Sequence, residues 1–125
     1  MTSVTISEAQ ASLAKILAGL HHPPLGAAVA LSEETGETAK ILLDHHGYGK
    51  ALDTSALAGE LADVFVCLAE IATLHGIDLG AAVSTKVDDL AKRAPRWRTE
   101  LSGALDAAWK GAHGNGARRP DAPTD

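Results

Sequence analysis

Aromatic residues and cysteines are scarce in this sequence. Phe, Trp and Tyr together make up 3% of the 125 residues, and Cys67 is the one cysteine. A single cysteine excludes a disulfide within the chain, so we expect Cys67 to behave as a small apolar residue. Clusters of the Val, Ile and Tyr residues that favour strands are also missing, whereas Ala and Leu are frequent. The composition therefore predicts an all-α protein.

An excess of positive charge and long apolar runs are lacking as well. The formal net charge is −5. A surface that follows a nucleic-acid backbone needs clustered Lys and Arg, so we expect no nucleic-acid partner. Acidic residues interrupt the longest apolar segment, so we expect no membrane span. Residues 1–6 have neither the basic start nor the apolar stretch of a signal peptide, which predicts a cytoplasmic protein.

Prolines, glycines and capping residues divide the chain into expected helices. The segment Ser7 to Gln10 has the pattern of a capping box, which predicts that the first helix begins at Ser7. Thr54 or Ser55 is the expected cap of the third helix, and Asp78 that of the fourth. Prolines and glycines mark the helix ends. The expected helices cover about residues 7–20, 25–46, 54–75, 79–94 and 96–110.

The length fits one domain, which we place at residues 1–110. Residues 111–125 are rich in Gly and Pro and lack apolar anchors, so they are predicted to form a disordered tail. A domain of this size has a small core, and its amphipathic helices leave apolar flanks uncovered. We therefore expect the chain to form a homo-oligomer.

Two pairs of acidic residues fall on helix faces that should be apolar. Glu34 and Glu37 share one such face, and Glu60 and Asp63 share another on the next helix. The apolar residues on these faces include Ala27, Ala30, Ile41, Val64, Cys67 and Ile71. Converging buried carboxylates destabilise a fold unless they are compensated. Because oxygen-only ligands select hard cations, the pattern predicts a Mg²⁺ site that also accepts Mn²⁺.

The alternative for these residues is a solvated acidic stripe. In that interpretation Glu33, Glu34 and Glu37 pair with Lys40 and with neighbouring chains, as acidic residues on exposed helices often do. Two acidic pairs on two apolar faces favour the metal site over this alternative.

The acidic pairs resemble the motif of the MazG-like nucleotide pyrophosphohydrolases, an all-α family. That motif is Glu-x-x-Glu, a gap of roughly a dozen to under thirty residues, and Glu-x-x-Asp; here 22 residues separate Glu37 from Glu60. The resemblance covers about residues 25–95 and includes the helix entry Gly76-Ile77-Asp78-Leu79, Lys86 and the exit Arg93-Ala94-Pro95. It implies a bundle of four to five helices, of the all-α nucleoside triphosphate pyrophosphatase type, whose core is assembled as a homodimer or homotetramer.

The same resemblance implies an activity and roles for single residues. Mg²⁺ bound by Glu34, Glu37, Glu60 and Asp63 would support hydrolysis of a nucleoside or deoxynucleoside triphosphate to the monophosphate and pyrophosphate. Metal chemistry of this kind needs no protein nucleophile, and a carboxylate near the attacking water, Glu33 or Glu37, would act as general base.

The fourth expected helix offers positive charge for the triphosphate. Lys86 lies on its apolar stripe with Arg93 nearby, although a lysine in such a stripe often only extends to solvent. Many relatives have an asparagine four residues after this lysine, where the present chain has Leu90. This departure and the few aromatic residues keep open a non-catalytic metal-binding helical module of the same fold. A pyrophosphohydrolase of a phosphoribosyl nucleotide is a further alternative, because similar helical carboxylate folds serve that substrate.

Overall fold

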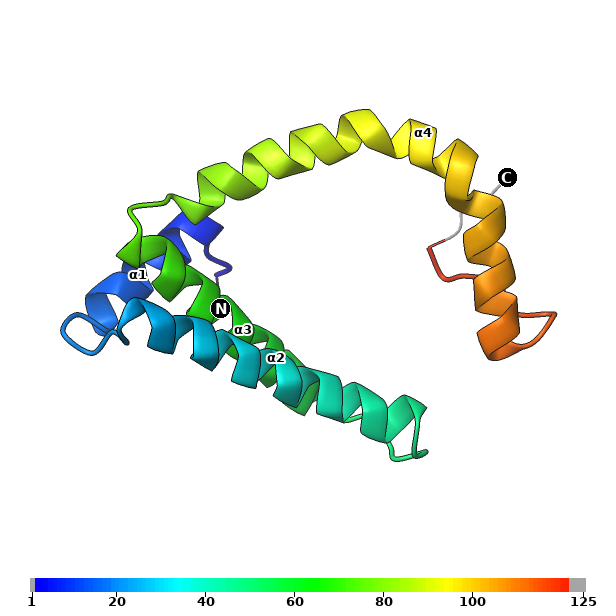
Figure 1. Ribbon diagram of the computed structural model, residues 1–125, viewed down its shortest axis with the longest axis horizontal. Coiled ribbons are helices and arrows are strands. Elements are labelled where there is room, and N and C mark those ends of the chain that lie inside the picture. Colours follow the sequence, from blue (N-terminus) through cyan, green and yellow to red (C-terminus); the bar gives the residue numbers. More distant parts are fainter. Residues whose placement is uncertain (1, 122–125) are drawn as a thin grey trace. The chain divides into compact units, whose positions relative to one another are not determined.

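The computed structural model describes residues 2–121 and is all-helical, with no strand among these residues (Figure 1). Its four helices are α1 (Ile6–Ile16), α2 (Pro24–His46), α3 (Thr54–Leu74) and α4 (Leu79–His113). The predicted all-α class is confirmed. Within the described residues, none of the helices combines the length and the apolar character that crossing a bilayer requires. The chain divides into two units, Met1–Val83 and Ser84–Asp125, which we describe separately.

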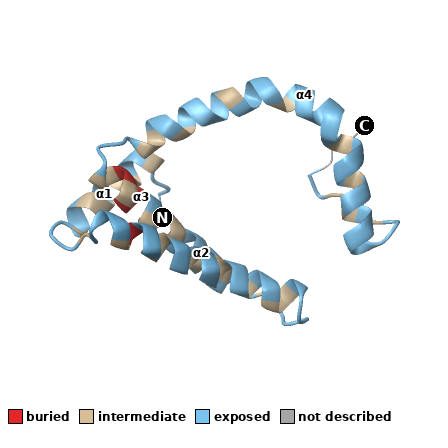
Figure 2. Ribbon diagram, viewed as in Figure 1, coloured by how far each residue is buried: buried red, intermediate tan, exposed pale blue. Residues whose placement is uncertain are grey.

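The antiparallel pair of α2 and α3 forms the centre of the first unit, and α1 packs on α3 (Figure 1). The fully buried apolar residues are three alanines, Ala27 of α2 and Ala69 and Ala72 of α3 (Figure 2). Because alanine side chains are short, the two helix backbones approach each other closely. The core is therefore small, and the large apolar side chains lie around it partly exposed.

Two predicted helix starts were wrong by one or two residues. α1 is capped by Thr5, whose hydroxyl accepts from the N–H of Glu8 at 3.1 Å, while the Glu8 carboxylate accepts from the Thr5 N–H at 2.7 Å. The capping box therefore lies two residues before the predicted one at Ser7. Asp53 caps α3 by accepting from the N–H of Ala56 at 3.0 Å, because its carboxylate stands in the extended residue just before the helix.

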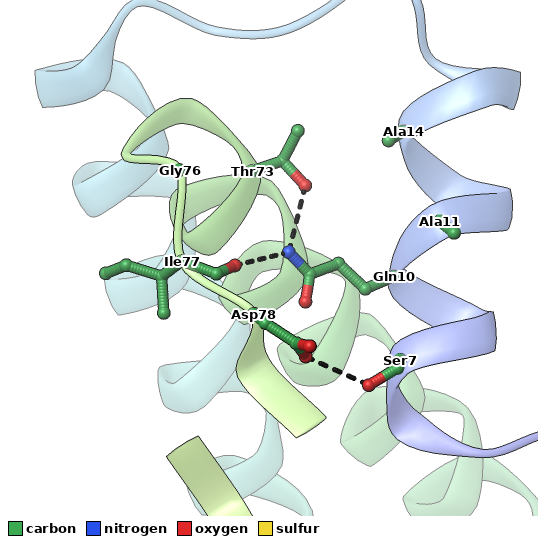
Figure 3. Close-up of a pocket in the computed structure, with 8 residues that line it drawn as sticks. All are labelled: Ser7, Gln10, Ala11, Ala14, Thr73, Gly76, Ile77 and Asp78. Atoms are coloured by element: carbon green, nitrogen blue, oxygen red, sulfur yellow. Dashed lines mark hydrogen bonds between the residues drawn. The ribbon is translucent and has the colours of Figure 1, made fainter. Parts of the chain in front are cut away.

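Ser7 and Gln10 of α1 bind the start of α4 instead of capping their own helix (Figure 3). The Gln10 amide donates to the carbonyl of Ile77 at 2.7 Å and accepts from the N–H of Leu79 at 2.8 Å. Ser7 donates to Asp78 at 2.9 Å, and Asp78 caps α4 as predicted, by accepting from a backbone N–H at 3.1 Å. The hollow of about 400 Å³ between these residues is lined by polar groups that already bind one another. We therefore interpret this region as a structural link.

Replacing Gln10 with alanine is expected to lower the free energy of unfolding by about 1–2 kcal/mol, because two net hydrogen bonds are lost. Urea denaturation of Q10A measures this loss. Ser12→Ala, on the exposed side of the same helix, is the matched control and should stay within about 0.5 kcal/mol of wild type. Equal stability of Q10A and wild type would show that the link contributes nothing.

α4 continues through Pro95, so the prediction of two separate helices at this point was wrong. Proline fixes φ near the helical value and lacks an N–H, so it removes one hydrogen bond and bends a helix without always ending it. The following turn adds compensating bonds. The Thr99 hydroxyl donates to the Pro95 carbonyl at 3.2 Å, and Arg96 pairs with Glu100 at 2.7 Å.

The second unit consists of most of α4 and the segment that follows it. α4 ends at His113, three residues beyond the expected domain end at 110. Gly114 then adopts a left-handed conformation with φ 97°, and Arg119 pairs with Asp106 of α4 at 2.8 Å. Residues 122–125 of the predicted disordered tail lie outside the described residues.

Candidate metal centre

The acidic pairs of α2 and α3 meet at the interface of the two helices. Glu34 and Glu37 lie one turn apart on α2, and the antiparallel α3 brings Glu60 opposite them. One carboxylate oxygen from each of these three residues lies within 4.8 Å of the other two. The structure thus brings together three of the four predicted ligands.

Burial differs among the predicted ligands. Glu34 and Glu60 are half-buried, whereas Glu37 and Asp63 are exposed. The expectation that all four lie on buried faces was therefore wrong for two of them, because so few helices pack in the first unit that its helix faces stay open to solvent. The Oε2 atom of Glu60 is buried and has no hydrogen-bond partner among the described residues. A buried polar atom of this kind is costly unless a ligand satisfies it.

The carboxylates repel one another and shift two pKa values upward. Burial raises the pKa of Glu34, and the charges of Glu37, Asp63 and Glu33 add to the effect. Burial also raises the pKa of Glu60, with further contributions from Glu37, Glu34 and Asp63. Asp63, the fourth predicted ligand, and Glu33, one of the two predicted candidates for the general base, therefore act on the same site electrostatically.

No described basic residue of the first unit forms an ion pair with these five carboxylates. In particular, Lys40 pairs with Asp44 at 3.1 Å, and Lys50 lies 3.5 Å from the same carboxylate. The alternative in which Lys40 neutralises the acidic stripe is thus not what the structure shows. The negative charge of the site thus has no ion-pair partner among residues 2–83.

The donor set fits a hard divalent cation. All ligand atoms are carboxylate oxygens, and two oxygens bound about 2.1 Å from one octahedral Mg²⁺ lie about 3 Å apart when they are neighbours and about 4 Å apart when they are opposite. The three oxygens lie within 4.8 Å of one another, so rotation of their side chains would be needed to bring them to one ion. A cation would also satisfy the buried Oε2 of Glu60 and remove the repulsion that raises the pKa values.

Comparisons with protein families, with characterised proteins and with solved structures gave no match to this chain. The resemblance to the MazG-like family thus stays a prediction that the acidic motif supports. What the structure adds is local: it brings the first acidic pair and Glu60 to one place, as a shared metal site requires.

The predicted phosphate-binding residues, Lys86 and Arg93, belong to α4 and to the second unit. Both are exposed. Arg93 pairs with Asp89 one turn earlier, and its guanidinium lies 5.0 Å from the centre of the Trp97 ring. Their role toward a substrate at the carboxylates of the first unit stays a prediction.

One buried acidic residue was not predicted from the sequence. Glu70 of α3 is 8% exposed and accepts from the backbone N–H of His22 at 2.8 Å. The His22 ring nitrogen Nδ1 lies 2.9 Å from the same oxygen. The signal was present, since Glu70 interrupts an otherwise apolar segment of α3. The contacts of Glu70 with His22 hold the segment before α2 against α3, which indicates a structural role.

Cys67, predicted to be a small packing residue, is half-buried on α3. Burial raises the pKa of its thiol, and Glu34, Glu70, Asp63 and Glu33 raise it further. A raised thiol pKa lowers the fraction of the reactive thiolate. This environment does not suit a nucleophile.

The metal-free protein is expected to become more stable as the pH falls from neutral toward about 4.5. The ordinary pKa of a glutamate is 4.5, and the fold raises the pKa of Glu34 and Glu60. Ionisation of these two carboxylates therefore destabilises the folded state relative to the unfolded state. This destabilisation is absent below pH 4.5 and complete above the raised pKa values. The lowered pKa values of Asp44 and Asp78, from an ordinary 3.8, oppose this gain only at lower pH.

Urea denaturation in EDTA across pH 4.5 to 8 tests this expectation. The double variant E34Q/E60Q is the control, since histidines and other groups also titrate in this range. The wild type should gain more stability on acidification than the variant does. If the two pH profiles are parallel, the carboxylates are not coupled as described.

Proposed function

We propose that this protein is a Mg²⁺-dependent nucleoside triphosphate pyrophosphohydrolase, which converts a ribo- or deoxyribonucleoside triphosphate and water to the monophosphate and pyrophosphate. The observation that carries the proposal is the meeting of Glu34, Glu37 and Glu60, with oxygens within 4.8 Å and a buried unpaired Oε2 on Glu60. The resemblance of the acidic motif to the MazG-like family supplies the reaction.

Each residue of the site has a proposed task. Glu34, Glu37, Glu60 and Asp63 would hold Mg²⁺, or Mn²⁺ in its place. A divalent ion at such a site neutralises phosphate charge, polarises the phosphoryl group and acidifies water. Glu37 is exposed, so it can reach both the ion and an incoming water molecule.

The exposed Glu33 is the other candidate for proton acceptance. As water adds to phosphorus, Glu33 or Glu37 takes up its proton, and the bond to the departing pyrophosphate breaks. Lys86 and Arg93 would bind phosphate oxygens and offset their charge.

We also propose that the chain works as a homodimer or homotetramer. Within residues 2–121 the buried apolar residues are three alanines, whereas large residues such as Leu25, Leu61 and Leu43 are each more than half exposed. Burying such side chains against further subunits would enlarge a core that is small for one domain.

A panel of ribo- and deoxyribonucleoside triphosphates tests the function, with Mg²⁺ present and pyrophosphate measured. E37Q and D63N should lower kcat/KM about 100-fold or more, since loss of a partner that merely orients a metal ligand already costs 10- to 100-fold. Asp88→Asn, an exposed carboxylate on α4, is the matched control and should retain activity. No release from any nucleotide, with E37Q and D63N indistinguishable from wild type, would refute the proposal.

The panel also separates the alternatives. A phosphoribosyl nucleotide belongs in it as a further substrate. Titration calorimetry distinguishes the non-catalytic module, which would bind Mg²⁺ without binding a nucleotide more tightly. Leu90, in place of the usual asparagine of the resembling family, motivates this comparison.

A further inference from the structure

The continuity of α4 through Pro95 reveals an apolar stripe that two separate helices would have divided. From Val87 to Ala104, apolar residues follow each other at alternating intervals of three and four, as at the a and d positions of a heptad repeat. These residues are Val87, Leu90, Ala94, Trp97, Leu101 and Ala104. The pattern continues to Val83 before them and Ala108 after them. In this register Pro95 takes the outward position b.

Among the described residues of its unit, this stripe is only partly covered. No residue of α4 is buried, and Val87, Leu90, Trp97 and Leu101 are 37–56% exposed (Figure 2). The segment after α4 covers one side of the stripe only in part: Arg119 pairs with Asp106 at the outward position f, and with Asp121 it lines a cavity of about 290 Å³ that stays open beside Trp97 and Leu101. An amphipathic helix of this length needs tertiary packing of its apolar face.

We propose that α4 pairs with α4 of a second copy of the chain as an antiparallel two-stranded coiled coil, centred between Ala94 and Trp97. This proposal does not rest on the proposed hydrolysis. It goes beyond the expected oligomer by assigning the interface, the orientation and the register.

Side-chain size favours the antiparallel orientation. In the antiparallel register Trp97 packs on Ala94 of the second copy, and Val87 packs on Ala104, so the tryptophan and the valine each meet an alanine. The two leucines of the stripe, Leu90 and Leu101, face each other. A parallel pair would place Trp97 against Trp97 and Ala94 against Ala94. The two tryptophans would push the helices apart, and the two alanines would leave a void between them.

Charge favours the same orientation. Arg93 and Glu100 both occupy position g, and the antiparallel register places Arg93 beside Glu100 of the second copy, twice by symmetry. A parallel pair would place Arg93 beside Arg98 of the second copy, at position e, where the like charges repel. The present partners within α4, Asp89 for Arg93 and Arg96 for Glu100, form exposed ion pairs that contribute little and can be exchanged.

Sedimentation equilibrium of the full chain tests the interface. R93E and E100R each turn two attractive pairs into repulsive ones and should weaken dimerisation about tenfold, whereas R93E/E100R should restore it. Lys92→Glu changes the charge equally at the outward position f, where it takes part in neither ion pair of this region, and should have no effect. Restored dimerisation of the double variant would identify the pair between residue 93 of one copy and residue 100 of the other. A contact of Arg93 with phosphate would not be restored by E100R.

The orientation is measured by the distance between spin labels on Lys110→Cys in a Cys67→Ser background. The antiparallel dimer should give roughly 40 Å, from 1.5 Å of rise per residue, against less than about 20 Å for a parallel pair. A monomer at tens of micromolar, a dimer that R93E strengthens, a dimer that the charge variants leave unchanged, or the shorter distance would each overturn the proposal.

Discussion

Replacing Glu60 with glutamine is expected to have opposite effects on stability and on activity. The half-buried Glu60 carboxylate is repelled by Glu37, Glu34 and Asp63, and burial raises its pKa. A neutral amide removes that repulsion and can donate to the unpaired oxygens around it, so the metal-free variant should unfold at a higher temperature than wild type. The same change removes a proposed ligand charge, and pyrophosphate release should fall about 100-fold or more.

Thermal unfolding in EDTA and the pyrophosphate assay in Mg²⁺ measure the two effects on the same preparation. Addition of Mg²⁺ should raise the unfolding temperature of wild type more than that of E60Q, because ligand binding stabilises the folded state in proportion to its affinity. D88N is the matched control and should show neither effect. If E60Q were less stable than wild type without metal, Glu60 would be a structural residue, and the electrostatic argument for the site would fail.

Helix boundaries show which parts of the fold local sequence signals determine. The prediction of Asp78 as the cap of α4 is confirmed, because a cap bonds backbone N–H groups two or three residues further on, which a local sequence pattern can indicate. The α1 and α3 caps were misplaced, since Thr5 and Asp53 compete with Ser7 and with Thr54 or Ser55 within a few residues. For Ser7 the competition was decided by a bond to Asp78, 71 residues away in the sequence.

Pro95 shows the limit of a local rule. A proline removes one hydrogen bond, but whether a helix ends there depends on the residues on both sides. Here Arg96, Thr99 and Glu100 form side-chain bonds in the turn that follows. The sequence rule gave a boundary where the structure has a continuous helix, and the heptad pattern of α4 is visible only when that boundary is removed.

The candidate site also has one property that the sequence predicted and one that it could not predict. Helical periodicity predicted which carboxylates share a face, and the antiparallel pairing of α2 with α3 brings Glu60 to Glu34 and Glu37. Periodicity could not predict how deep each one lies, because burial depends on how many helices cover the face. Glu37 and Asp63 are exposed for this reason. The contact of Glu70 with His22 spans 48 residues and also had no local signal beyond an acidic residue among apolar ones.

Replacing Ala69 with leucine is expected to weaken both the fold and metal binding. Ala69 is 1% exposed on α3, which packs mainly against α2. A leucine here must push the neighbouring helices away, and overpacking of this kind costs about 2 kcal/mol of unfolding free energy. The carboxylates of the site stand on the same two helices, so a wider spacing moves Glu34 and Glu37 away from Glu60. Affinity for Mg²⁺ should therefore fall, although no ligand has changed.

Urea denaturation measures the first effect and titration calorimetry with Mg²⁺ the second. Ala58→Leu, on the exposed side of α3, adds the same side chain and should change stability by less than about 0.5 kcal/mol. Unchanged stability and unchanged Mg²⁺ affinity of A69L would show that the α2 and α3 packing does not hold the site. Together with E60Q, this variant separates two roles: A69L lowers stability and metal affinity in parallel because it alters the position of the ligands, whereas E60Q alters their charge and moves the two quantities apart.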